Sequence, residues 1–233
     1  MSTEKGLFLH EEVMLLALRD KEGTVVPGTL YQYAIGGAIL AELLLTERIA
    51  VDESRRSKLV DVINSEPVGN PLVDECLERI AAARRRASLQ NWVSRVAGIR
   101  DLKHRTACQL CKRGILRADE DTVLLLFRRR IYPEVDPQPE RRLIERLRRA
   151  IFSDTPDVDP RTAILVSLAR SAGLLKVVFD KKQLRARKTR IKQIADGQIT
   201  GKATKEAIEA MQAAVMVACI MPAMAISATT VSH

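Results

Sequence analysis

Apolar residues recur at intervals of three and four along most of the chain, which is the period of an amphipathic helix. The first such stretch, residues 7–19, carries a stripe of leucines and ends at a charged turn. Residues 29–47 are apolar on nearly every face, which predicts a buried central helix. Further helices are predicted over 72–86, 88–97, 100–113, 141–151 and 161–172, with two more between 177 and 233 that divide near 197–201.

Short apolar segments bounded by turn residues predict two β-hairpins. One pairs residues 48–51 with 59–63, and the other is assembled from 115–116, 122–128 and 131–132. The connectors 133–139 and 153–160 are too short to separate independent domains, so we expect residues 1–233 to form one domain. The pattern as a whole predicts a mainly α fold: a helical bundle ringed by amphipathic helices, with a projecting β-hairpin.

Two features of the central helix break its apolar pattern. Gly36 and Gly37 each cost about 1 kcal/mol relative to alanine inside a helix. We interpret them as the place where another helix comes close. Glu42 lies in the same apolar run, where we expect it to bond backbone or a basic side chain.

Composition narrows the class of protein. Aromatic residues make up only 3%, so the core must be aliphatic. A formal charge of +9 predicts attraction to anionic lipid surfaces or nucleic acid. The unpatterned cysteines and the N-terminus without a signal pattern suit a reducing, cytoplasmic setting. The apolar run 213–227 is shorter than the roughly 20 residues that span a bilayer, and we expect a core helix there.

No arrangement of residues announces catalysis. The sequence contains no Ser-His-Asp, HExxH, P-loop or GxGxxG pattern, and we expect neither enzyme activity nor a cofactor. Cys108 and Cys111 could hold zinc with His104, but a second cysteine pair is missing, so buried thiols and no metal are favoured. The adjacent acids Glu11 and Glu12 are expected to cap a helix or lie on the surface.

Five segments together are similar to one known family. They are LFLHEEVMLLAL (7–18), AELLLTERI (41–49), GNPLVDECL (69–77), LQNWVSRVAG (89–98) and AILVSLARSAGLL (163–175). In this order, over roughly residues 6–220, they resemble the Golgi phosphoprotein 3 family. The resemblance implies a non-enzymatic peripheral membrane protein that binds phosphatidylinositol 4-phosphate in a basic pocket.

The family's pocket combines an early Trp and Arg with two basic residues three apart before the hairpin. The resemblance places the second pair at Arg100 and Lys103, which a spacing of three would put on one helix face. The early pair falls near Pro27 and Gly36, which cannot make a charged contact. Arg105 or the run Arg84–Arg86 could substitute. We therefore expect charge-driven binding with little selectivity among phosphoinositides.

Two alternative functions remain open. The basic helix 100–113, a turn and a hairpin bearing Arg128–Arg130 have the outline of a winged helix, which would bind nucleic acid. This reading is less favoured because the helix offers few side chains that read bases. A protein-interaction scaffold that self-associates through the hairpin is the other alternative.

Overall fold

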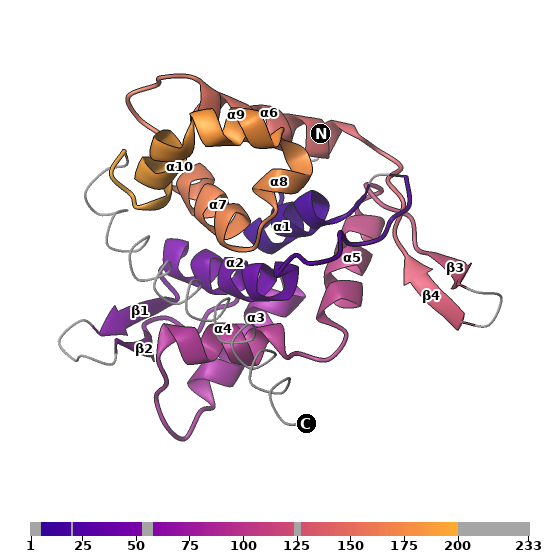
Figure 1. Ribbon diagram of the computed structural model, residues 1–233. Coiled ribbons are helices and arrows are strands. Elements are labelled where there is room, and N and C mark those ends of the chain that lie inside the picture. The colour runs from indigo at the N-terminus through magenta and orange to yellow at the C-terminus, as the bar shows by residue number, and fades with distance from the viewer. Residues whose placement is uncertain (1–5, 20, 53–57, 124–126, 200–233) are drawn as a thin grey trace, which may run out of the picture.

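The computed structural model describes residues 6–19, 21–52, 58–123 and 127–199. Within these ranges the chain forms ten helices and two separate two-stranded sheets (Figure 1). The helices are α1 (Leu9–Ala17), α2 (Tyr31–Leu45), α3 (Pro71–Ala81), α4 (Leu89–Ala97), α5 (Leu102–Lys112), α6 (Gln138–Phe152), α7 (Pro160–Ser171), α8 (Leu175–Val178), α9 (Lys181–Ala186) and α10 (Lys188–Ala195). The strands are β1 (Ile49–Asp52), β2 (Leu59–Val62), β3 (Asp119–Val123) and β4 (Phe127–Ile131). The predicted mainly α fold is confirmed.

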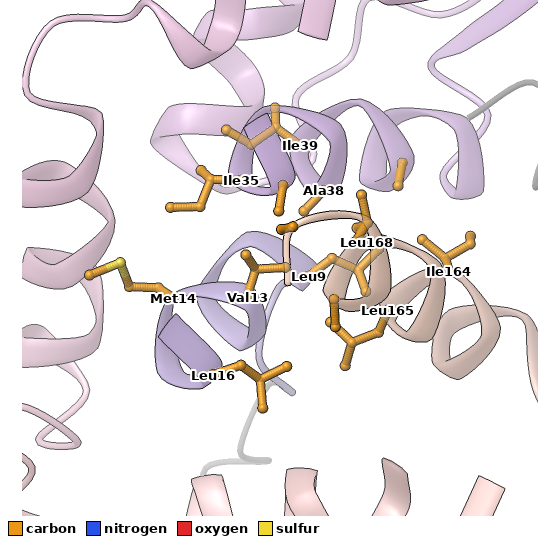
Figure 2. Packing of buried hydrophobic residues seen from close by; sticks show 14 of the residues in the cluster. Leu9, Val13, Met14, Leu16, Ile35, Ala38, Ile39, Ile164, Leu165 and Leu168 are labelled. Atoms are coloured by element: carbon orange, nitrogen blue, oxygen red, sulfur yellow. The ribbon is translucent and has the colours of Figure 1, made fainter. Parts of the chain in front are cut away.

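The first two helices of the chain and the later helix α7 form the centre of the molecule. Every residue of α1 is buried, and α1 packs against both α2 and α7. Figure 2 shows the contact, where leucines and isoleucines of the three helices interdigitate. The outer helices bury only one stripe each; α4, for example, buries Leu89, Trp92, Val93 and Val96. The residues that the sequence pattern assigned to the core are therefore the ones that pack here.

The central helix α2 approaches α4 closely at a glycine. A Cβ atom built on Gly36 would lie 2.9 Å from the carbonyl oxygen of Val93 and 3.2 Å from the amide nitrogen of Ala97. Real Cβ atoms essentially never come as close as the first of these distances, and the second is tighter than most Cβ contacts. The predicted close approach of a second helix is therefore confirmed at this position, and it explains why a residue with poor helix propensity is present.

The first hairpin forms as predicted, and it also shortens α3. Strands β1 and β2 pair antiparallel, with Ile49 opposite Val62. The predicted helix 72–86 ends at Ala81, because the chain then runs beside β2. There the amide of Val60 donates to the carbonyl of Ala87 at 3.0 Å.

The second hairpin has different strands from those predicted. The expected strand 122–128 is divided between β3 and β4, and the acidic residues Asp119–Asp121 belong to β3. Acids are poor strand formers by propensity. Here they are stabilised by lying opposite arginines, since Glu120 faces Arg130 and Asp121 faces Arg129.

The end of the described chain is more broken than predicted. Between residues 175 and 195 it forms three short helices where one was expected. Asp180 separates α8 from α9, because its side chain caps α9 by accepting from the amides of Lys182 and Gln183. The second predicted C-terminal helix and the apolar run 213–227 lie outside the described residues. Among the described helices, none is long and apolar enough to cross a membrane.

Candidate anion-binding site

Arg100 lies on the turn that leads into α5. Its side chain is 98% exposed, and its ion pair within the described residues is a long one, 3.6 Å to the neighbouring Asp101. Asp101 has left-handed backbone geometry, and its side chain does not cap the helix. The first amides of α5 therefore have no side-chain acceptor beside an exposed guanidinium. This combination attracts anions.

Lys103 lies in the first turn of α5, at the base of the second hairpin. Its side chain is half-buried, with the ammonium 5.6 Å from the centre of the Tyr132 ring. Burial lowers the pKa of Lys103, and the positive charge of Arg129 lowers it further. A bound anion would stabilise the charged form of Lys103, because its negative charge offsets both effects.

The predicted helix 100–113 begins at Leu102, which changes the expected geometry. Arg100 precedes the helix, so the prediction that a spacing of three puts it on one helix face with Lys103 is wrong. The two residues instead occupy the entering turn and the first helical turn. Both still border the same helix N-terminus.

Two of the predicted substitute residues, Arg105 and Arg86, are occupied elsewhere. Arg105 forms an ion pair with Glu75 of α3, and this hydrogen bond holds the pKa of Glu75 below its usual value. Arg86, at the end of the Arg84–Arg86 run, pairs with Asp52 at 3.1 Å and with Asp61. The structure therefore places Arg100 just before α5 and Lys103 in its first turn, but directs Arg105 toward α3.

The positions of the family's early pair offer no charged contact. Gly36 is buried against α4, where the backbone of Val93 leaves no room for a side chain. Pro27 is exposed on the loop before α2. A pocket at this place would have to work with Arg100, Lys103 and the amides of α5.

The arginines of the second hairpin are balanced by acids of the facing strand. Arg129 contacts Asp121 at 2.6 Å, and Arg128 lies 3.8 Å from Glu120. Gln109 of α5, whose amide could in principle read a base, is bonded to His10 at 2.8 Å. These contacts lower the net positive charge of the hairpin and occupy a side chain that could read bases. A winged-helix function requires both a cationic wing and free base-reading side chains.

A buried network of charges beneath α1 was only partly foreseen. Glu42 accepts from the amide of Leu9 at 2.8 Å and from Arg161 at 2.9 Å, so the expected core bond is confirmed. Arg161 also donates to the carbonyl of Leu7 and lies 3.8 Å from Glu12. The three central helices are thus joined by charge as well as by packing.

The adjacent acids of α1 are buried, which corrects the expected surface role. Glu11 does cap the helix, accepting from the amide of Phe8 at 2.9 Å, but it is only 2% exposed and pairs with Arg113 at 3.0 Å. Glu12 is 4% exposed and pairs with Arg146 at 2.9 Å. Burial raises the pKa of both carboxyls despite these arginines. The sequence lacked a signal for this, because the partners lie more than a hundred residues away.

His104, which could hold zinc with Cys108 and Cys111, contacts Tyr132 and Cys108 in the structure. His104 Nδ1 lies 2.5 Å from the Tyr132 hydroxyl and 3.6 Å from the Cys108 sulfur. Among the described residues, no group of three His, Cys, Asp or Glu side chains is placed to hold a metal ion. Cys108 and Cys111 are partly exposed, so the prediction that these two thiols are buried is wrong. Cys76 is buried, and burial raises its pKa to about 12.

Comparison with known proteins gives one family. The model of the Golgi phosphoprotein 3 (GPP34) family matches residues 9–211, most of the chain. Vacuolar protein sorting-associated protein 74 of Eremothecium gossypii is 30% identical over 169 residues, which are 64% of this chain and 49% of that protein. The aligned part thus spans about half the length of this relative.

Proposed function

Because the chain belongs to the Golgi phosphoprotein 3 family, we propose that it is a non-enzymatic peripheral membrane protein of the cytoplasm that binds anionic phospholipid head groups. The observation that carries the proposal is the exposed Arg100 beside the uncapped first turn of α5, with Lys103 next to it. A phosphate there would accept from a guanidinium, an ammonium and backbone amides together.

The same geometry predicts how selective the binding is. A phosphoinositide-specific pocket needs several fixed donors around one head group, and positions 27 and 36 supply none here. Arg105 could take part only by leaving Glu75. We therefore expect phosphatidylinositol 4-phosphate to bind little better than other lipids of equal charge.

Vesicle flotation at low salt tests the proposal. Replacing both Arg100 and Lys103 by alanine should weaken binding to vesicles containing phosphatidylinositol 4-phosphate by at least about tenfold, since each charge-assisted contact contributes roughly 1.5–3 kcal/mol. The melting temperature should stay nearly unchanged, because neither side chain takes part in the buried network.

A matched pair on another helix provides the control. Arg141 and Arg149 are exposed on α6, and replacing both by alanine removes the same charge without touching α5. Arg146 is unsuitable, because it pairs with Glu12. An equal loss from the α6 variant would mean diffuse attraction without a defined site. Binding that does not depend on anionic lipid at all would overturn the proposal.

A further inference from the structure

A second cationic site lies far along the sequence from Arg100, among the four helices at the end of the described chain. The end of α7 and helices α8, α9 and α10 border a pocket of about 480 Å³, and Figure 1 shows these helices forming a ring in orange. Its described lining residues are Arg170, Gly173, Leu175, Lys176, Lys181, Leu184, Arg185, Lys188 and Ile191. Five of the nine are basic, and none of the nine is acidic. Pockets of this volume accommodate small molecules.

The basic side chains around the pocket are available for a ligand. Arg170 has only a long contact with Asp196, at 4.0 Å. The other four, Lys176, Lys181, Arg185 and Lys188, are exposed and make no ion pair within the described part of the chain. The nearby Asp180 is engaged with the backbone amides of α9.

Other basic residues of the same segment have structural partners, which sets the pocket residues apart. Arg187 pairs with Asp154 at 2.8 Å, and Arg190 donates to the carbonyl of Thr155 at 2.7 Å. These two arginines attach α10 to the loop after α6. Between residues 181 and 195 the sequence has seven basic residues and no acid. This run of basic residues is the signal in the sequence that indicates the pocket.

The floor of the pocket is apolar. Leu175 and Ile191 are each only 5% exposed and present part of their surface to it, together with the half-buried Leu184. At Gly173 a Cβ atom would meet nothing within 4 Å, so the backbone there is open to a ligand. A cationic rim over an aliphatic floor complements a molecule with an anionic end and an aliphatic body.

We propose that this pocket binds a single-chain anionic amphiphile, with its phosphate or carboxylate between the rim cations and its chain over Leu175, Leu184 and Ile191. The proposal does not depend on head-group binding at Arg100 and Lys103, because it rests on different helices and on an apolar floor. Rim contacts are charge-assisted, and the floor removes CH₂ groups of the bound chain from water.

Isothermal titration calorimetry with three soluble probes tests the proposal. Octyl phosphate, used below its micelle concentration, should bind the full chain with one-to-one stoichiometry. Inorganic phosphate lacks the chain, and octyl glucoside lacks the charge. Each should bind at least about tenfold more weakly than octyl phosphate, because each keeps only one of the two contacts.

Two charge-reversal variants locate the site. Arg185→Glu with Lys188→Glu changes the pocket rim and should weaken octyl phosphate binding by at least about tenfold. Lys182→Glu with Lys192→Glu makes the same charge change on the same two helices, but outside the pocket lining. This variant should change the affinity for octyl phosphate by less than about twofold. Circular dichroism should show that both variants keep their helices.

The outcomes separate this site from the proposed membrane site and from other ligands. Replacing Arg100 and Lys103 by alanine should leave octyl phosphate binding intact. Leu184→Gln should remove the advantage of octyl phosphate over inorganic phosphate, since it interrupts the floor. Equal losses in the two charge-reversal variants, or equal affinity for phosphate with and without the chain, would overturn the proposal. So would saturable binding of duplex DNA or an acidic peptide at these residues in place of octyl phosphate.

Discussion

His10 shows how strongly one buried side chain can depend on its surroundings. It lies fully buried in α1, and burial lowers its pKa from 6.5 to about 4. Nε2 bonds the side-chain oxygen of Gln109 at 2.8 Å, whereas Nδ1 has no partner among the described residues. A second proton would therefore have no acceptor within the part of the chain that the structure describes. Glu42 favours this proton and Arg161 opposes it, but both effects are smaller than burial.

The low pKa of His10 predicts a loss of stability in mild acid. The unfolded chain binds a proton near pH 6.5 and the folded chain only near pH 4, so the contribution to stability is complete above pH 6.5 and falls as the pH decreases toward 4. Between pH 7 and 5 the free energy of unfolding should fall by about 2 kcal/mol from this group alone. Urea titrations at several pH values measure it.

The matched variant is His10→Gln, which keeps a donor for Gln109 but does not titrate. Its stability should be about 2 kcal/mol less sensitive to this pH change than that of the unchanged protein. The raised pKa values of Glu11 and Glu12 act in the opposite direction, but they do so in both proteins. Parallel pH profiles would show that His10 is not the titrating group.

Helix packing at Gly36 predicts a cost for the smallest possible substitution. Gly36→Ala improves helix propensity by about 1 kcal/mol, yet its Cβ would lie 2.9 Å from the Val93 carbonyl. Overpacking of this kind usually costs about 1–3 kcal/mol, so the net effect should be a lower melting temperature. Gly98→Ala is the control, since its Cβ would lie at an ordinary 3.5 Å from Ser94. A stabilised Gly36→Ala protein would mean that α2 and α4 can separate without loss.

Much of this helical arrangement could be predicted from the sequence, because its causes are local. The three-and-four spacing of apolar residues defines α4 and α6, and Ser88 and Asp159 cap α4 and α7. The failures have distant causes. The end of α3 depends on pairing with β2, and the acids of β3 form a strand only because arginines face them. No local pattern contains that information.

In the candidate site, too, features with local causes could be predicted from the sequence and contacts between distant residues could not. The resemblance predicts Arg100 and Lys103 as site residues, which stays a prediction. The sequence could not show that Arg105 is directed to Glu75, because Glu75 lies 30 positions away. Glu42 was correctly expected to find a partner, while Arg161 as that partner was not identifiable. Positions within one helix turn are predictable, and pairings between helices require the fold.

The net charge of the whole molecule is unevenly distributed, which predicts weak nucleic-acid binding by the second hairpin. The hairpin arginines lie against acids of the facing strand, whereas the basic residues that line the pocket at α8–α10 have no acidic residue among them. Replacing Arg128 and Arg129 by alanine should change affinity for duplex DNA by less than about twofold. Fluorescence anisotropy at two salt concentrations measures this.

The converse change supplies the control for that experiment. Glu120→Gln with Asp121→Asn removes the balancing acids and should raise DNA affinity at low salt by at least about threefold, since the arginines can then pair with phosphates. A tenfold or greater loss from the arginine variant would instead support a winged-helix function.

The ion pair between Glu42 and Arg161 also has a consequence in time. The two residues are 119 positions apart, so α1 and α2 leave the ribosome long before the partner of their buried carboxylate exists. At about 5–20 residues per second, synthesis of the intervening chain takes roughly 6–24 s. Until Arg161 has been synthesised, burying Glu42 beneath α1 would leave its negative charge without a positive partner. We therefore expect α1 and α2 to pack in their final arrangement only after α7 has been synthesised. A truncated nascent chain that ends before α7 should bind chaperones and should not form a folded intermediate.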